Sequence, residues 1–393
     1  MSSQVPTTHI DVVGGGLAGL VAAIEASSRG LDVDLWEAHA ELGGRARTAQ
    51  PYRANFGPHA LYNDGATWAW LTRHGLLPPV VMPSVRTGFV HGEVFGRVPP
   101  SGLRRGLRLL YSRALAPSGV SAVEWLADRL GSADDAELSC RAFFPFYDSD
   151  VGSQDASVVW DVMRRTRWQP ARYVVGGWST MVAMLEQRAL ANGVRIHLHH
   201  PFDLGDRGVG PTIVATELAT AARLLADESL TWPSSTVACL DVGLAAETLS
   251  RQGKRRASAI DLDNVGFISR YTSKDRSLAP SGGEVIQATG SRRAGESIDA
   301  SVERIRAGLD AVYPGWSEGV SWSRRFDASG RATPWHAPGT TWHDRPAIDR
   351  GGNCYLVGDH VAAPGFLAEV SVNSAVQAVE MVAVASRDAQ RIW

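Results

Sequence analysis

The chain has 393 residues, of which 44% are hydrophobic and 20% charged, and its formal net charge is −2. This length predicts two domains, or one domain with a large insertion, around a sizeable core. The nearly neutral charge argues against nucleic acid as a partner.

The cysteines and the N-terminal segment predict the compartment. Cys140, Cys239 and Cys354 are far apart and match no metal or redox spacing, so we expect buried thiols in a reducing compartment. The first residues, MSSQVPTTH, have neither the basic nor the apolar region of a signal peptide. The longest apolar run, 12–24, is too short to span a bilayer. These features predict a cytoplasmic protein that is not transmembrane, and they leave the oligomeric state open.

The first predicted unit is a strand, a helix and a second strand that ends in an acid. Ile10–Val13 is a short apolar strand, 17–28 reads as a helix, and 33–36 as a strand that leads to Glu37. Three glycines between the first strand and the helix have the G-x-G-x-x-G spacing: Gly14, Gly16 and Gly19. In this βαβ context the spacing is typical of a dinucleotide site.

Each glycine has a separate physical reason. The first permits a tight turn, the second lets a pyrophosphate approach the backbone, and the third lets the helix pack close to the strand. The amides at the helix start, Leu17 and Ala18, would face the phosphates. Glu37, followed by Ala38, would accept hydrogen bonds from the ribose hydroxyls, and its charge disfavours a 2′-phosphate. The alternative is a tight turn that binds no nucleotide.

A second glycine turn follows in the sequence AHAELGGRART. Gly43 and Gly44 allow a close turn, and Arg45 and Arg47 are well placed to meet phosphate charge. Taken alone, the GGR segment is also compatible with an ordinary surface turn.

These motifs together resemble those of the flavin-containing amine oxidoreductases and their phytoene desaturase relatives. The resemblance implies FAD as the nucleotide, with the GGR segment along its pyrophosphate. It also implies an α/β fold, in which a Rossmann-like FAD-binding domain of the glutathione-reductase type is interleaved with an α+β substrate domain.

The segment 55–61, NFGPHAL, resembles the one that these families place beside the isoalloxazine ring. It contributes four candidate FAD neighbours: Gly57, Pro58, His59 and Ala60. From the residues alone, His59 is a titratable group on a turn, and a surface histidine is the simpler interpretation. The resemblance makes it the candidate catalytic residue beside the flavin.

Residues 66–170 change character, and we expect an inserted domain there. The pattern predicts a helix over 66–74 and short strands within 80–99. Further helices are predicted over 103–115, 122–130 and 134–146. Four aromatic residues at its end are interpreted as core, with an apolar pocket as the alternative: Phe143, Phe144, Phe146 and Tyr147.

The segment 173–178, YVVGGW, resembles the family's return to the nucleotide domain. A helix over 180–191 and a strand over 194–199 follow, and the resemblance places Phe202 beside the adenine. The next strand is predicted over 211–216, before a helix over 217–226. Relatives carry an antiparallel hairpin between these two strands, and the short interval 203–210 predicts that it is nearly absent here.

A second substrate block begins at 236, with strands predicted over 267–272 and 284–288 and a helix over 297–313. The last predicted strand, 353–357, ends at Gly358 and Asp359 and is followed by a helix over 370–385. This end resembles the family's GD motif, which implies that Asp359 binds the ribityl chain and that the amides near Phe366 and Leu367 approach the flavin carbonyl. Asn373 and Ser374 stand where relatives often have a smaller pair.

The resulting division is discontinuous. Three segments would form the FAD-binding domain and two the substrate domain: 1–78, 171–235 and 335–393, with 79–170 and 236–334 between them.

The predicted function is FAD-dependent oxidation of a small metabolite, apolar or aromatic, by hydride transfer from a substrate C–H to flavin N5. Amine oxidases commonly place a lysine near N5, but Lys254 and Lys274 are the only lysines and neither has a matching context. The sequence therefore favours phytoene-desaturase-like over simple amine-oxidase chemistry. A redox-neutral isomerase and a non-catalytic flavin-binding partner protein remain alternatives.

A metal site is the other constellation considered. His197 and His199 alternate on a predicted strand beside His200, but no carboxylate or cysteine stands near them at ligand spacing. We therefore interpret them as solvated side chains and expect no metal.

Overall fold

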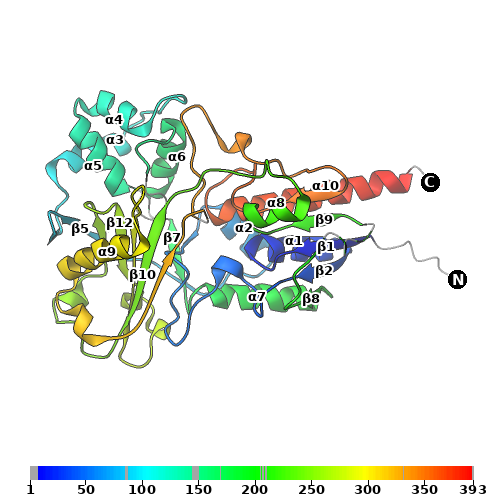
Figure 1. Cartoon of the computed structure of the whole chain (residues 1–393), viewed down its shortest axis with the longest axis horizontal. Helices are drawn as coiled ribbons and strands as arrows, with labels where there is room; N and C mark the ends of the chain where they lie inside the picture. The colour runs from blue at the N-terminus through cyan, green and yellow to red at the C-terminus, as the bar shows by residue number, and fades with distance from the viewer. Residues whose placement is uncertain are drawn as a thin grey trace.

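The computed structural model describes residues 8–391 except 85–86, 144–149, 169, 204, 206–207, 209 and 331. A parallel sheet lies in the part of the molecule that is nearer both termini, to the right in Figure 1. The five strands have the order β15-β9-β1-β2-β8 and all neighbours run parallel. They are β1 (His9–Val13), β2 (Asp32–Trp36), β8 (Arg195–His197), β9 (Thr212–Val214) and β15 (Cys354–Leu356).

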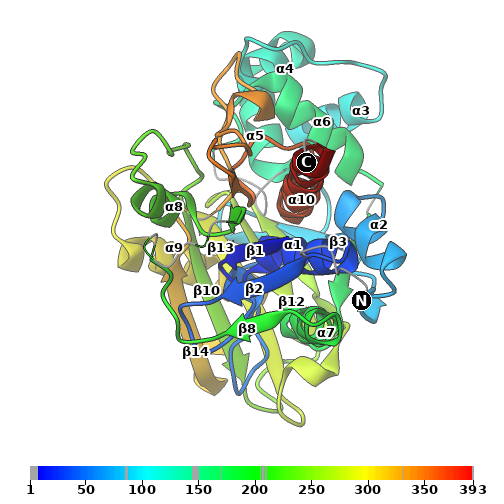
Figure 2. The ribbon, with the colours of Figure 1, turned by 90° about the vertical axis from the view of Figure 1, so that its right-hand side faces the viewer.

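Helices cover one face of this sheet because alternate strand residues are apolar. Ile10 and Val12 on β1, with Val33 and Leu35 on β2, are buried in the same core as the helices. Helix α1 (Leu17–Ser28) packs against both α7 (Trp178–Ala191) and α10 (Ala368–Arg391), and α10 also packs against α2 (Ala66–Arg73). Figure 2 shows α1 between α7 and α10. Helix α8 (Leu218–Leu225) adds Ala221 to this core.

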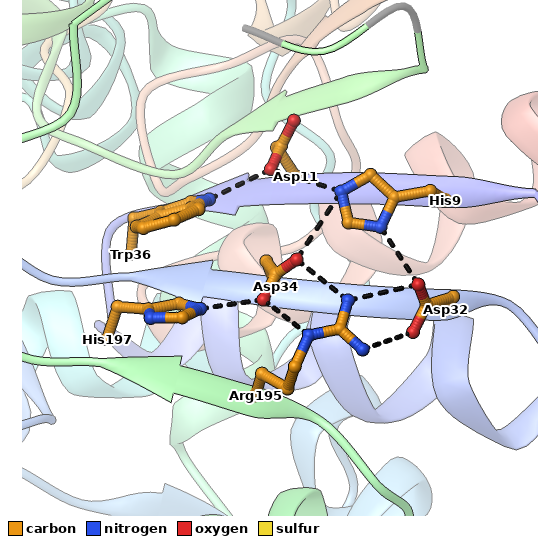
Figure 3. A network of polar contacts seen from close by, with 7 residues as sticks. All are labelled: His9, Asp11, Asp32, Asp34, Trp36, Arg195 and His197. Atoms are coloured by element: carbon orange, nitrogen blue, oxygen red, sulfur yellow. Dashed lines mark hydrogen bonds and ion pairs between the residues drawn. The ribbon is translucent and has the colours of Figure 1, made fainter. Parts of the chain in front are cut away.

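The opposite face of the sheet is polar (Figure 3). The Arg195 guanidinium on β8 binds Asp34 and Asp32 on β2, and His197 Nε2 lies 2.6 Å from Asp34 Oδ1. The Trp36 ring stacks on His197 at 4.0 Å and donates from Nε1 to Asp11 on β1. The sequence predicted that a hairpin would be nearly absent between β8 and β9, and none of the described residues in this interval forms a strand.

A larger, mixed sheet lies beside this part of the molecule, to the left in Figure 1. Its order is β14-β10-β13-β12-β11-β5-β6, with only the β5·β11 pair parallel. The strands are β5 (Thr87–His91), β6 (Val94–Gly96), β10 (Val237–Leu244), β11 (Ser258–Asp261), β12 (Gly266–Arg270), β13 (Glu284–Ser291) and β14 (Val320–Asp327). Helix α9 (Ile298–Val312) packs on it through Val302, Ile305 and Leu309.

Two smaller parts complete the fold. A short sheet joins β3 (Leu61–Tyr62), β7 (Ala171–Val174) and β4 (Val80–Val81). A cluster of four helices packs around the rings of Trp125 and Trp160, whose centroids are 4.6 Å apart. They are α3 (Ser101–Leu110), α4 (Ala122–Leu130), α5 (Ala133–Phe143) and α6 (Ala156–Thr166).

The helical cluster differs from the sequence expectation at two places. The helix expected over 103–115 ends at Leu110, because Tyr111, with φ −89° and ψ 2°, leaves the helical conformation. Helix α6 was not expected. It begins where the Asp155 carboxylate caps the Ser157 amide, and its apolar residues face the cluster.

Other sequence expectations also have outcomes here. The three cysteines are buried thiols that form no disulfide, as expected. Phe143 packs at the edge of the helical cluster, whereas Phe144, Phe146 and Tyr147 lie outside the described residues. Over the described part of the chain, no helix combines the length and the apolar character needed to cross a bilayer.

Candidate dinucleotide site and adjoining pocket

The glycine turn between β1 and α1 has the expected geometry. Gly14 has φ +105°, and a Cβ on Gly19 would lie 1.9 Å from the Gly14 carbonyl oxygen. A Cβ on Gly16, in contrast, would meet no protein atom within 4 Å. The first and third glycines are therefore required by the protein itself, and the second leaves space in front of the α1 N-terminus, at Leu17 and Ala18.

Sequence reasoning passed over Gly15. A Cβ there would lie 2.3 Å from Leu42 Cδ2, and the Gly15 amide donates to Glu37 Oε2 at 2.8 Å. The other Glu37 oxygen accepts from the His39 amide at 2.8 Å, across Ala38. Glu37 is thus held, buried, at the end of β2 beside the glycine turn. In a run of three glycines, the sequence does not indicate which one packs against another side chain.

The second glycine turn lies directly on the first. Gly43 pairs with Gly16 in a parallel β-bridge, and its amide donates to the Gly15 carbonyl at 2.7 Å. Gly43 and Gly44 both have positive φ, +107° and +52°. A short 3₁₀ turn that contains Arg45 starts at Gly44, where a Cβ would lie 3.4 Å from Gly16 Cα. The structure therefore joins the two motifs that the sequence placed 24 or more residues apart.

Arg45 and Asp359 come from opposite ends of the chain and meet. Arg45 Nη2 donates to Asp359 Oδ1 at 2.8 Å, and His360 Nδ1 lies 2.9 Å from the same oxygen. Burial by itself would raise the pKa of Asp359, but Arg45 and His360 hold this pKa far below its ordinary value. Asp359 is therefore a carboxylate at every working pH, aligned at the sheet edge beside Gly358.

Helix α10 holds this end of the sheet in place. The Gly358 amide donates to Ser374 Oγ at 3.0 Å, and Asn373 Nδ2 donates to the Pro364 carbonyl at 2.9 Å. Asn373 and Ser374, which depart from the pattern of the relatives, fasten the segments before and after Asp359 to the helix.

The turn before α10 is strained and clamped. Leu367 has φ +54°, an unusual conformation for a residue with a Cβ. Arg165 on α6 binds the buried Glu369 carboxylate with both of its terminal nitrogens, Nη1 at 2.6 Å, and covers the Phe366 ring at 4.6 Å. This ion pair between α6 and α10 fixes the turn that carries Phe366 and Leu367.

The segment that carries Gly57, Pro58, His59 and Ala60 runs beside α7. His59 Nδ1 lies 2.9 Å from the Gly57 carbonyl oxygen, so Nδ1 is the protonated nitrogen, and the ring meets Trp178 edge-on at 4.6 Å. Burial lowers the pKa of His59 to about 4, which the Gly57 carbonyl opposes and the charges of Arg45 and Arg324 reinforce. His59 is therefore neutral at pH 7, with Nε2 as an acceptor.

A cavity of about 200 Å³ adjoins this segment. Its wall includes Pro58, His59 and Ala60 on one side and Leu367 on another, together with residues of the mixed sheet such as Phe267 and Ser258. Tyr173 and Tyr271 stand in its wall with ring centroids 4.5 Å apart and their hydroxyls hydrogen-bonded. Among the described residues, none of those lining it has a charged side chain.

Sequence reasoning missed this tyrosine pair and Arg324. Tyr173 belongs to the segment recognised as the return to the nucleotide domain, and Tyr271 to a predicted strand. Their contact depends on how these two distant segments pack together. Arg324 on β14 donates to the Asn55 carbonyl at 2.6 Å and lies 4.0 Å from the Phe56 ring. Its partner Asp241 has a pKa that burial raises to about 6, against the effect of Arg324. Neither residue belongs to a motif that a single sequence displays.

The remaining candidates lie as follows. Phe202 is buried beside Trp36, with ring centroids 5.9 Å apart, at the end of the sheet that carries Glu37. Neither Lys254, which pairs with Glu247, nor Lys274 lines the cavity. The sequence around His197 contains no carboxylate at ligand spacing, but in the fold His197 contacts Asp34 on the neighbouring strand β2.

The cluster in Figure 3 also holds the only group of potential metal ligands found among the described residues: His9, Asp11 and Asp34. Arg195 already supplies a permanent positive charge to Asp34, so a divalent cation would compete with the guanidinium. We do not assign a metal to it.

Comparison with known proteins identifies chains of similar fold. A family model described as an NAD(P)-binding Rossmann-like domain matches residues 12–74. An oxidoreductase from Methanosarcina mazei has 18% identity and a TM-score of 0.73, over 95% of this chain and all of that one. Cyclohexylamine oxidase from Brevibacterium oxydans has 14% identity and a TM-score of 0.72, over 97% and 100%. Reduced UDP-galactopyranose mutase has 11% identity and a TM-score of 0.66, over 96% and 95%. At these identities the likeness shows the fold, and it confirms the predicted fold class.

Proposed function

We propose that this chain binds FAD and is an oxidoreductase that acts on a small, uncharged, apolar or aromatic substrate. The residues fit the cofactor: the space in front of Gly16 would be filled by any side chain there, and two glycine turns and a helix N-terminus border it. A pyrophosphate is the group that such a cradle accepts.

Each part of the cofactor would have its own residues. Glu37, Ala38 and Phe202 would hold the adenosine, and Asp359 the ribityl chain. The pyrophosphate would lie on the two glycine turns: Gly14, Gly16, Leu17, Ala18, Gly19, Gly43, Gly44 and Arg45. The ring would lie between the segment 57–60 and the turn of Phe366 and Leu367. The division into FAD-binding segments 1–78, 171–235 and 335–393 follows from this assignment.

Bound FAD would supply the redox chemistry by accepting a hydride at N5 from a substrate carbon. The chain supplies position and polarity. His59 is held neutral, and because Gly57 fixes the Nδ1 proton, Nε2 can accept a hydrogen bond but is too weak a base to remove a proton from carbon. We therefore assign His59 to orienting the flavin and the substrate.

The proposed substrate class rests on the uncharged side chains that line the cavity. A cation such as an ammonium ion would lose its hydration there without gaining a carboxylate from any of the described lining residues. An apolar molecule gains from the same burial, and the tyrosine hydroxyls of Tyr173 and Tyr271, whose pKa values burial raises, remain neutral partners for one polar atom.

Anaerobic reduction of the flavin tests this choice. The flavin absorbance is followed with matched pairs of compounds that share a ring and differ in carrying an alcohol or an ammonium group. We expect bleaching by neutral members and at least a tenfold slower reaction with the cations. Faster bleaching by the ammonium compounds would contradict the proposed substrate class.

Redox-neutral isomerisation is the second candidate, because reduced UDP-galactopyranose mutase shares the fold. Turnover of the best bleaching compound under oxygen separates the two. An oxidase consumes oxygen and releases peroxide in proportion to product. An isomerase turns over only when its flavin has been reduced beforehand, and it releases none.

A further inference from the structure

The sequence around α3 is strongly basic. Between residues 94 and 123 there are five arginines and no aspartate or glutamate. The arginines are Arg97, Arg104, Arg105, Arg108 and Arg113, and all five are exposed. Arg105 is paired with Asp135, whereas Arg108 has no hydrogen-bond or ion-pair partner among the residues that the structure describes.

Large apolar side chains are exposed in the same region. Trp168 and Leu115 are each 70% exposed and Tyr111 58%. The Trp168 ring meets Tyr111 edge-on at 5.6 Å, and Arg167 lies 5.2 Å from the Trp168 ring. Isolated exposed apolar residues are common, but aromatic rings grouped with arginines on one surface indicate an interaction site.

Helix α3 presents these groups along one side. Leu103, Gly106 and Leu110 face inward and are buried, and Gly102 and Gly106 bring the helix close to Asp135 and Ser139 of α5. Arg104, Arg108 and Tyr111 recur at the spacing of the opposite side, and Tyr111 continues this side to Trp168. We call Arg104, Arg108, Tyr111 and Trp168 the α3 face.

The α3 face and the cavity wall share a segment of the chain. Thr166 and Pro170, which precede and follow Trp168, both line the cavity, as does Met82, which is half exposed. The exposed Trp168 is therefore two residues along the chain from a lining residue on either side.

We propose that the α3 face docks the protein on an anionic lipid surface. Arginines at such a surface gain from the negative potential of the headgroups, and tryptophan and tyrosine rings are stable at the boundary between headgroups and acyl chains. A bilayer matches both features, because it offers negative charge and an apolar layer side by side. The docked orientation places the cavity wall at the lipid. This inference does not depend on FAD.

Sedimentation with lipid vesicles tests the proposal. The full chain is mixed with vesicles of phosphatidylcholine alone, or of phosphatidylcholine with phosphatidylglycerol, and the bound fraction is measured over a range of salt. We expect binding to the anionic vesicles only, and weaker binding as salt rises. The double variant Arg104→Glu/Arg108→Glu should lose about thirtyfold or more in vesicle affinity, since each arginine contributes roughly fivefold. Trp168→Ser should lose about tenfold.

Two matched variants control for charge and apolar character elsewhere. Arg223→Glu changes an exposed arginine on α8, and Leu190→Ser removes an exposed leucine on α7. Both should bind like the wild type, and unchanged thermal unfolding establishes that the α3 variants remain folded. The proposal is overturned if the wild type does not bind anionic vesicles. Binding of an acidic protein to the α3 face, without binding to vesicles, would also overturn it. It is equally overturned if the α3 variants bind as well as the controls. Flavin content does not enter these measurements, so their failure leaves the proposed oxidoreductase function untouched.

Discussion

Two glycines of one motif, Gly16 and Gly19, have different surroundings. The protein itself fills the space where a Gly19 side chain would lie, but no protein atom lies within 4 Å of a Cβ on Gly16. Gly16 has φ −73°, which any residue can adopt, so its lack of a side chain serves no backbone requirement. A ligand is the remaining physical reason for a glycine at this position.

Alanine at Gly16 should therefore weaken FAD binding, whereas alanine at Gly19 should lower the stability of the fold. Gly16→Ala should leave the free energy of unfolding of the apoprotein within about 0.5 kcal/mol of wild type and weaken FAD binding at least tenfold. Gly19→Ala should destabilise by about 2 kcal/mol or more, since its Cβ overlaps the Gly14 carbonyl. Urea unfolding and flavin titration measure the two quantities. Equal FAD affinity in Gly16→Ala would show that the open space does not hold the pyrophosphate.

The neutral state of His59 makes a second residue-level prediction. Its pKa is about 4 in the folded chain against 6.5 ordinarily, so the stability linked to it is complete above pH 6.5 and is lost as pH falls towards 4. His59→Gln should flatten this part of the stability curve. The NMR signal of the His59 ring, identified by its loss in the variant, should not move between about pH 6 and 8. A midpoint near 6.5 would contradict the burial that we describe.

At the scale of elements, the start of α10 depends on α6. The Arg165–Glu369 pair joins them, and the strained Leu367 lies two residues before Glu369. Strain of this kind persists only where the surroundings impose it. The helical cluster thus helps to shape the turn assigned to the flavin.

Removing one partner of this pair should be costly. Glu369→Gln or Arg165→Gln should each lower the free energy of unfolding by about 2–4 kcal/mol, because the other charge is left partly buried. The double variant should lose less than the sum of both, and a double-mutant cycle of urea unfolding measures the coupling. Strict additivity would mean that the pair does not clamp α10.

The polar face of the parallel sheet makes a prediction about pH. Arg195 holds the pKa of Asp32 at about 2. Burial would raise the pKa of Asp34, but hydrogen bonds from Arg195 and His197 outweigh it and lower this pKa. The stability gained from these pairs is present above the ordinary aspartate pKa and is lost as pH falls through about 2. Arg195→Met should therefore cost about 1–2 kcal/mol at neutral pH, a moderate value because Arg195 and Asp32 are partly exposed, and less in acid. Arg223→Met is the control. A difference independent of pH would contradict the network.

Elements with local signals were predictable, and contacts between distant elements were not. The βαβ unit, the GGR turn and the GD end follow from glycine spacing and apolar strands, and α1 and α4 begin and end where the sequence indicated. The shortened link between β8 and β9 was also visible. The tyrosine pair, the Arg165 clamp and the polar face each need side chains from segments that no local pattern connects. The sequence predicted the strands that carry His197 and Asp34, but not the contact between these two side chains.

At the scale of the whole molecule, both ends of the chain build one site. Arg45 binds Asp359, which lies 314 residues later in the sequence. The cavity is lined both by the segment of His59 and by residues of the mixed sheet. The division of labour that we propose follows from this arrangement. The parallel sheet and its loops hold the cofactor, the mixed sheet and the small sheet form the substrate wall, and the helical cluster clamps the turn and presents the α3 face.

The most direct test is the absorption spectrum of the full chain after incubation with FAD and removal of free cofactor by gel filtration. Absorption bands near about 375 and 450 nm that remain with the protein, and that are lost in Gly16→Ala, are the predicted result. FAD that elutes wholly apart from a folded chain would contradict the assignment, and the glycine turns would then belong to another nucleotide or to none.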